Sequence, residues 1–373
     1  MQDSLRCMKK ILSVHYDEIA LKGKQRGYFQ SLLIKNLEKK TGKKVNLLDN
    51  RLIIEDFDEK IVEIIKMTPG VSWIGHAYKI DRNEEELMNL IKDIIKDEKE
   101  INLDVKRVDK EFAKTSVELK EQIAKTFGIH FNNTGKKIKV EIMKDSFIIN
   151  YNIERGLGGM PTGSAGRVLA LFSGGIDSTI APIEIMKRGS KVDLLHVYAL
   201  NSPENAISGK IEEITKKLSK IESGIKLYLV PFHYFSLSAM KIDKRYELVM
   251  FKRFLLKLAE KIAQEYGYQA IVSGDSLSQV ASQTIENINA ISYGIDIPVF
   301  RPFIGFNKSE IIDKSIKYGF YELSIQKYKD CCSIVSKNPA TKSRRELIEE
   351  MEKQIDIDKI VEDSLKELKI LYY

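Results

Sequence analysis

The stretch Val-Leu-Ala-Leu-Phe-Ser-Gly-Gly-Ile-Asp-Ser, residues 168–178, decides the fold of the C-terminal half of the chain. Its apolar beginning predicts a buried strand over 168–172, and its glycines predict a tight turn before a helix that runs to residue 187. Small residues let the backbone N–H groups of such a turn curl around an anion, and the helix N-terminus adds partial positive charge. Ser173 and Ser178 add hydroxyl donors. No Gly-Lys-Ser/Thr follows, so the loop is not the Walker sequence, and the alternative to a phosphate loop is an ordinary glycine-rich turn.

After this loop the sequence keeps alternating between strand and helix patterns. Strands are expected over 192–197, 226–230 and 270–273, and helices over 211–221, 246–266 and 309–318. Such alternation is typical of an α/β, doubly wound parallel sheet, which binds ligands at the carboxyl ends of its strands. The last thirty residues are rich in Glu, Lys and Ile and predict a helical tail on the surface.

The first 155 residues have a different pattern, in which short strands and helices mix as in α+β domains. Five glycines within residues 155–166 exclude a helix or a central strand there, so this segment predicts a domain boundary. We therefore expect α+β domains over 1–55 and 56–160, followed by the α/β domain over 161–373.

Several chemistry-bearing residues follow the predicted strand ends or lie on the long helix 246–266. The alternative for each of them is a strand-end or surface residue with no special role. They are His196 and Val197, Lys252 and Arg253, the amide- and hydroxyl-rich run 274–284 with Gly274 and Gln283, and the cations Arg301 and Lys308.

Charge is distributed unevenly along a chain whose net charge is +7. Residues 20–51 carry nine Lys/Arg against two Asp/Glu, and residues 106–144 carry ten against five, with an acidic segment between them. Basic segments attract phosphate backbones, and the alternative is a set of solvated helix faces. The charge pattern therefore favours a nucleic-acid partner without requiring one.

Three cysteines in 373 residues exclude a secreted disulfide framework, and they lack the paired spacing of a structural zinc site. No apolar run reaches the length of about 18 residues that a membrane span needs, so we expect a cytoplasmic protein without a membrane partner. Two of the cysteines are vicinal, Cys331 and Cys332, and nearby Lys329 and Lys337 favour the thiolate form. The alternative is a pair of buried structural cysteines.

Taken together, the motifs resemble those of the tRNA 4-thiouridine synthetases, a tRNA sulfurtransferase family, and the 173–178 loop resembles the PP-loop of ATP pyrophosphatases. The resemblance covers essentially the whole chain. It rests on EIALKGKQRGYF (18–29), VKRVDKEFAKTSVEL (105–119), GLGGMPTGSAGRVLALFSGGIDS (156–178), GDSLSQVASQT (274–284) and RPFIGFNKSEII (301–312).

The resemblance implies a ferredoxin-like N-terminal domain, a THUMP RNA-binding domain and a PP-loop domain. It implies that ATP adenylates O4 of the uridine at position 8 of tRNA and that a persulfide sulfur then displaces AMP. The implied catalytic residues are Asp177, Cys332 and Lys308. The implied ATP contacts are Leu171, Phe172, Ser173, Gly174, Gly175, Asp177, Ser178, His196, Val197, Lys252, Arg253, Gly274 and Gln283. The implied RNA contacts are Lys22, Lys24, Arg26, Lys106, Arg107, Lys110 and Lys114.

The resemblance also sets expectations about cofactors and partners. ATP with Mg²⁺ is expected, without a protein metal site, together with the acceptor-stem region of tRNA and a homodimer. Many family members carry a C-terminal rhodanese domain that this sequence lacks, so sulfur is expected from a cysteine desulfurase, another donor or sulfide.

Two other functions fit parts of the sequence. A PP-loop AMP-forming ligase acting on a small molecule would form AMP without RNA and would leave the basic N-terminal half unexplained. A non-catalytic RNA-binding module would need a dead PP-loop, against which the intact Ser-Gly-Gly-Ile-Asp-Ser and Cys332 argue.

Overall fold

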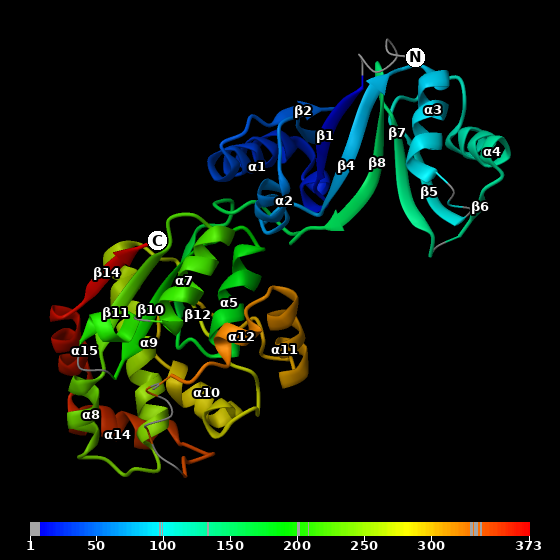
Figure 1. The fold of residues 1–373 in the computed structure, drawn as a ribbon. Coiled ribbons are helices and arrows are strands. Elements are labelled where there is room, and N and C mark those ends of the chain that lie inside the picture. The colour runs from blue at the N-terminus through cyan, green and yellow to red at the C-terminus, as the bar shows by residue number, and fades with distance from the viewer. Residues whose placement is uncertain are drawn as a thin grey trace. The chain divides into compact units, whose positions relative to one another are not determined.

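The computed structural model describes residues 8–373 except 97, 99, 133, 200, 201, 208, 329, 330, 332–334, 336 and 337. The chain folds into two compact units, residues 1–161 and 162–373. Each unit is built around its own sheet (Figure 1). Among the described residues, no helix is long and apolar enough to cross a membrane.

The first unit contains an eight-stranded sheet in the order β2-β3-β1-β4-β8-β7-β5-β6. Its strands are β1 (Lys9–His15), β2 (Asn46–Leu48), β3 (Arg51–Ile54), β4 (Trp73–Asp81), β5 (Glu100–Arg107), β6 (His130–Phe131), β7 (Lys136–Ile142) and β8 (Ser146–Arg155). Its helices are α1 (Arg26–Thr41), α2 (Glu59–Lys66), α3 (Glu84–Ile95) and α4 (Ser116–Phe127), with 3₁₀ turns η1 (Glu18–Leu21) and η2 (Gly23–Gln25).

Separate apolar clusters pack against the two halves of this sheet, and a smaller one joins β1, β4 and β8 in its middle. Leu12 and Val14 of β1 pack with Leu33 and Leu37 of α1, whereas α3 and α4 cover the half formed by β5 and β7 (Figure 1). The sheet itself is continuous, because β4 pairs with β1 on one side and with β8 on the other. The division expected at residue 55 falls between β3 and α2 and stays a prediction.

The second unit contains a six-stranded sheet in the order β13-β12-β9-β10-β11-β14. Its strands are β9 (Arg167–Leu171), β10 (Lys191–Tyr198), β11 (Lys226–Pro231), β12 (Ala270–Val272), β13 (Val299–Phe300) and β14 (Lys369–Tyr372). Its helices are α5 (Ile176–Met186), α6 (Pro203–Ile207), α7 (Lys210–Ile221), α8 (His233–Ala239), α9 (Glu247–Tyr266), α10 (Ile285–Ser292), α11 (Lys308–Lys317), α12 (Tyr321–Ser324), α14 (Arg345–Ile355) and α15 (Ile357–Lys366), with the 3₁₀ turn η3 (Ala281–Gln283).

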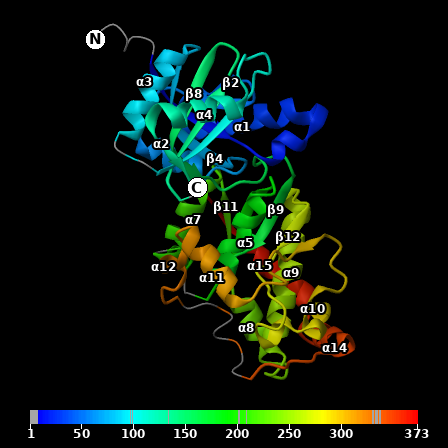
Figure 2. The ribbon, with the colours of Figure 1, turned by 90° about the vertical axis from the view of Figure 1, so that its right-hand side faces the viewer.

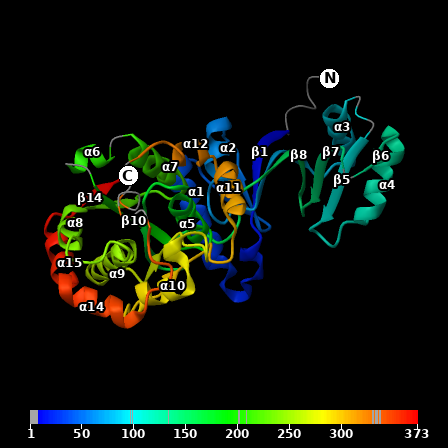
Figure 3. The same cartoon turned by 90° about the horizontal axis from the view of Figure 1, so that it is seen from below.

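The predicted doubly wound parallel sheet is confirmed. Strands β9 to β13 pair in parallel, and the apolar runs of β9 to β12 are buried because helices cover both faces. Figure 3 shows α5 and α7 on one side of β10 and α9 with α15 on the other. Helix α11 packs beside α5 (Figure 2), so the residues at the starts of these two helices come together.

The last thirty residues are helical as expected, in α14 and α15, but the expectation that this tail lies on the surface is wrong. Ile348, Met351 and Ile360 are buried in the main core of this unit, because α14 and α15 pack against α9. The chain then ends in β14, which pairs antiparallel with β11 and closes that edge of the sheet.

Candidate active site

A cavity of about 270 Å³ lies at the carboxyl ends of β9, β10 and β12, the place where doubly wound sheets bind ligands. It brings together residues that lie up to 160 positions apart, from Leu171 to Cys331. The sequence-predicted residues that line it are Leu171, Phe172, Ser173, Gly175, Asp177, Ser178, Val197, Lys252, Gly274, Gln283 and Lys308. Gly174, His196 and Arg253, which were also expected to contact ATP, are not among its lining residues.

The loop between β9 and α5 has the geometry of an anion cradle. Gly174 has a φ of +79°, a left-handed conformation that favours glycine, and a Cβ there would also displace the end of the Ile211 side chain, whose Cδ1 would lie 2.7 Å away. The backbone N–H of Gly175 donates to Ser173 Oγ, and the N–H of Ser173 donates to Ser178 Oγ at 3.2 Å. These bonds curl the loop around the N-terminus of α5, whose dipole favours a negatively charged group.

Asp177 lies in the first turn of α5 and is held from two sides. Lys308 Nζ donates to its Oδ1 at 2.6 Å, and Gln279 Nε2 donates to its Oδ2 at 2.8 Å. Lys308 reaches Asp177 because it begins α11, whose start is fixed by a reciprocal capping box between Asn307 and Glu310. Gln279 was missing from the predicted site residues, although the amide-rich run 274–284 was noticed.

A second ion pair, between Lys252 and Asp275, also lies in the lining of the cavity. Lys252 Nζ of α9 donates to Asp275 Oδ1 at 2.7 Å, and Gln283 Nε2 donates to the same oxygen at 3.1 Å. Burial opposes ionisation of Asp275, but the Lys252 ammonium and the Ser273 hydroxyl outweigh it and hold the pKa of this carboxyl well below its usual range. Asp275 was not among the predicted site residues, because sequence alone does not show which lysine it meets.

His196 is buried beside the cavity. Its Nδ1 lies 2.8 Å from the carbonyl oxygen of Phe172, and its Nε2 lies 2.8 Å from the Tyr328 hydroxyl. Burial lowers the pKa of His196 to about 4, so the ring is neutral at pH 7. A carbonyl only accepts, so Nδ1 carries the proton and Nε2 accepts from Tyr328. His196 thus joins the end of β9 to the segment that leads to the cysteines.

Cys331 lines the cavity and is buried, and its Sγ donates to the carbonyl oxygen of Val197 at 3.3 Å. The predicted catalytic Cys332, with Lys329 and Lys337, lies outside the described residues. Cys331, the residue before Cys332, therefore lies in the wall of the cavity.

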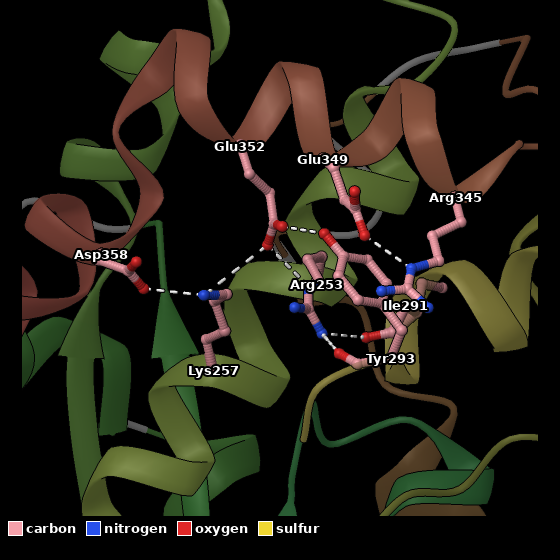
Figure 4. Close-up of polar contacts among 8 residues, drawn as sticks. All are labelled: Arg253, Lys257, Ile291, Tyr293, Arg345, Glu349, Glu352 and Asp358. Atoms are coloured by element: carbon pink, nitrogen blue, oxygen red, sulfur yellow. Dashed lines mark hydrogen bonds and ion pairs between the residues drawn. The ribbon is translucent and has the colours of Figure 1, made fainter. Parts of the chain in front are cut away.

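Arg253 does not line the cavity, and Figure 4 shows its side chain among Glu352, Ile291 and Tyr293. Its side chain is 2% exposed and donates to Glu352 Oε1 at 2.7 Å and to the carbonyl oxygens of Ile291 and Tyr293. These contacts anchor α9 to α14 and to the end of α10. We therefore leave Arg253 out of the proposed ATP site.

The predicted RNA-binding residues lie in the first unit, and three of them share a surface hollow. Lys106, Arg107 and Lys110 line a hollow of about 430 Å³ that also includes Thr115 and Ser116 at the start of α4. Helix N-termini and cations both favour phosphate, so this hollow suits a nucleic-acid backbone.

The other four predicted RNA contacts are arranged differently. Lys114 is paired with Glu84, and Lys22 lies 5.4 Å from the ring centroid of Phe29. Lys24 is exposed, and Arg26 donates to the carbonyl oxygen of Ala20 at 2.7 Å.

Two family models match the chain, one within each of its two units. The family model of the thiamine biosynthesis protein (ThiI) matches residues 163–357, and the model of the ThiI ferredoxin-like domain matches residues 11–75. The chain belongs to the ThiI family.

Relatives of the chain match over nearly their whole length. The chain is similar to a probable tRNA sulfurtransferase of Caldanaerobacter subterraneus, at 35% identity over 97% of this chain and 99% of the relative. It is 32% identical to one of Staphylococcus epidermidis, over 96% and 93% of the two chains. Its fold is similar to the crystal structure of a 4-thiouridine synthetase–RNA complex with bound ATP, with a TM-score of 0.85, 29% identity, and 98% and 99% of the chains covered.

Within this ThiI-family site, the structure adds residues that the motifs did not single out. Gln279 contacts the predicted Asp177, Asp275 contacts the predicted Gln283, and Ser273 contacts Asp275. A usable signal in the sequence was their position at or shortly after the end of a predicted strand, where polar side chains are rarely needed for packing.

Proposed function

We propose that this protein is an ATP-dependent tRNA sulfurtransferase that converts the uridine at position 8 of tRNA to 4-thiouridine. The observation that carries the proposal is the cavity in which the curled 173–178 loop lies beside Asp177 and Lys308, in a chain of the ThiI family. Relatives similar to it over nearly their whole length are probable tRNA sulfurtransferases, and the similar solved structure binds RNA and ATP.

The cavity suits a nucleotide whose α-phosphate is attacked. The N–H groups of the loop and the start of α5 receive the phosphates, and Lys308 supplies a cation at the same place. The uridine O4 attacks the α-phosphorus and pyrophosphate leaves. Sulfur then attacks C4, the C4–O bond breaks, and AMP leaves with that oxygen. When the sulfur is a persulfide, its S–S bond is finally cleaved by a second thiol, which ends in a disulfide.

Mg²⁺ fits this site through ATP rather than through a preformed cage. Among the described residues, no group of three or more His, Cys, Asp or Glu side chains is arranged to hold a metal. Mg²⁺ commonly uses one or two carboxylates together with substrate phosphates, and Asp177 is the carboxylate beside the loop that would hold it. Bound there, the ion would neutralise charge on the phosphates.

The partners follow from the same proposal. The acceptor-stem region of tRNA would contact Lys106, Arg107 and Lys110 in their hollow, with Lys22, Lys24, Arg26 and Lys114 as further contacts. Because duplex RNA is recognised by its backbone and shape, cations without a sequence code suffice. Sulfur would come from a cysteine desulfurase or another donor, the protein would act as a homodimer, and its tRNA substrate places it in the cytoplasm.

The test measures AMP release from ATP with and without unmodified tRNA, and 4-thiouridine in the recovered tRNA. Sulfide is the donor in one arm, and a cysteine desulfurase with cysteine in the other. AMP and thiouridine are expected together and only with tRNA. Asp177→Ala should abolish AMP release, whereas Cys332→Ser should spare adenylation and abolish thiolation in the desulfurase arm. AMP formed without RNA, from a small molecule, would replace this proposal with the ligase function.

A further inference from the structure

Asp275 is a carboxylate in the wall of the cavity that neither the motifs nor the family assignment gives a role. Its side chain is 14% exposed, and it lies three residues after the end of β12, next to Gly274. It lines the same cavity as the Asp177–Lys308 pair but belongs to none of the phosphate-loop contacts.

Both oxygens of Asp275 are engaged, and the groups they hold come from separate elements. Oδ1 accepts from Lys252 of α9 and from Gln283 of η3, at 2.7 and 3.1 Å. Oδ2 accepts from Ser273 Oγ at 2.7 Å, and Arg301 Nε lies 3.5 Å from it. A carboxylate has about four acceptor positions, so the orientation of Asp275 is fixed by this set of contacts.

The groups that Asp275 holds also face the cavity. Lys252 and Gln283 line it, and the Lys252 side chain is only 18% exposed. By comparison, Lys308 in the other pair is 44% exposed. The Lys252 ammonium therefore depends on Asp275 more than Lys308 depends on Asp177, because water can replace a partner at an exposed site and does so poorly at a buried one.

We propose that Asp275 is a positioning residue for the ATP-dependent step, which holds the Lys252 ammonium and the Gln283 amide where they meet the nucleotide. Asp275 itself contacts neither the phosphates nor the uridine. The inference rests on the proposed function only in that ATP occupies this cavity. It assigns to Asp275 an effect that passes through Lys252, and this is what distinguishes it from a residue that merely stabilises the fold.

The experiment is a double-mutant cycle on tRNA-dependent AMP formation, with Asp275→Asn, Lys252→Gln and the double variant. Asp275→Asn keeps the size of the side chain and removes its charge, and it should lower kcat/KM for ATP by roughly 10- to 100-fold. In the Lys252→Gln background the same change should cost less than about threefold, since its target is already gone. Equal losses in both backgrounds would overturn the inference.

Two further variants control for charge and for folding. Asp275→Glu keeps the charge and should retain most of the wild-type kcat/KM, whereas wild-type kcat/KM in Asp275→Asn together with a loss in Asp275→Glu would contradict the proposal. Asp358→Asn is the matched control. Asp358 pairs at 2.8 Å with Lys257, which lies on α9 as Lys252 does, but the Asp358 side chain is 70% exposed (Figure 4). It should leave kcat/KM within about twofold.

Thermal unfolding of each variant is measured alongside. If Asp275→Asn does not fold, Ser273→Ala tests the same point, since it removes one of the contacts that orient Asp275. Its loss of kcat/KM should disappear in the Lys252→Gln background, and an undiminished loss would contradict the proposal.

A wild-type protein that forms no AMP with tRNA would overturn the proposed function and not this inference. The cycle is then repeated on equilibrium binding of Mg-ATP. Weaker binding by Asp275→Asn only in the presence of Lys252 would support the positioning role, and unchanged or additively weakened binding would refute it.

Discussion

The Gly274→Ala variant tests how closely the loop that follows β12 must approach the phosphate loop between β9 and α5. A Cβ at position 274 would lie 2.8 Å from the carbonyl carbon of Asp177, 2.9 Å from its oxygen and 3.0 Å from the backbone nitrogen of Ser178. These are backbone atoms in the first turn of α5, so no side-chain rotation relieves the contact. Restoring an ordinary contact of about 3.4 Å requires a separation of roughly 0.6 Å between the loop and the helix.

The expected cost follows from what that separation displaces. Asp177 is held by Lys308 at 2.6 Å and by Gln279, from the same loop as Gly274, at 2.8 Å. A misplacement near 1 Å costs about 100-fold in rate, so we expect kcat/KM for ATP to fall by roughly 10- to 100-fold. That loss corresponds to about 1.4–2.7 kcal/mol of transition-state stabilisation. Overpacking should also lower the free energy of unfolding by about 1–3 kcal/mol.

The assay is AMP formation with saturating tRNA, accompanied by denaturant unfolding. Gly305→Ala is the matched control, because a Cβ at Gly305 would meet nothing within 4 Å and its φ is not in the left-handed region. It should stay within about 0.5 kcal/mol of the wild type in stability and within about twofold in rate. A Gly274→Ala protein with wild-type kinetics would refute the steric reasoning.

Three further predictions concern anchoring, protonation and RNA binding. Arg253→Met should lower the free energy of unfolding by about 3 kcal/mol while leaving the KM for ATP within threefold, because it breaks a buried ion pair outside the cavity; an increased KM with unchanged stability would contradict this. The pKa of His196 is about 4 in the folded protein and about 6.5 in the unfolded chain, so as the pH falls the unfolded chain binds this proton first. The contribution of the neutral His196 to the free energy of unfolding is therefore complete above about pH 6.5 and is lost towards pH 4. Between pH 7.5 and 5 the wild type should lose about 2 kcal/mol more unfolding free energy than His196→Gln, and equal losses in denaturant titrations would be the contrary result. The third variant replaces Lys106, Arg107 and Lys110 of the hollow by Ala. In filter binding at 50–200 mM salt, the slope of log K for tRNA against log salt should fall in magnitude by about 2–3 in this triple variant, whereas Lys261→Ala, at an exposed position, should leave the slope unchanged. An unaltered slope in the triple variant would exclude the hollow as a phosphate site.

The sequence by itself determined the local part of the site. The strand, glycine turn and helix over 168–187 follow from neighbouring residues, because an apolar run, a left-handed Gly174 and a helix start are each decided within a few positions. The alternation of strands and helices likewise predicted the parallel sheet, and with it the edge at which Val197 and Gly274 meet the loop.

The tertiary structure decided which side chains use that edge. Lys252 and Arg253 are neighbours on α9, about 100° apart around the helix axis, so docking of the helix alone determines that Lys252 faces the cavity and Arg253 faces Glu352. The same holds for the bond between His196 and Tyr328, which lie 132 positions apart. It also holds for β14, which was expected as part of a surface tail and instead pairs with β11. In each case the partner is distant in sequence. Hydrophobic periodicity predicts that one face of a helix or strand is buried, but it does not predict which other element covers that face.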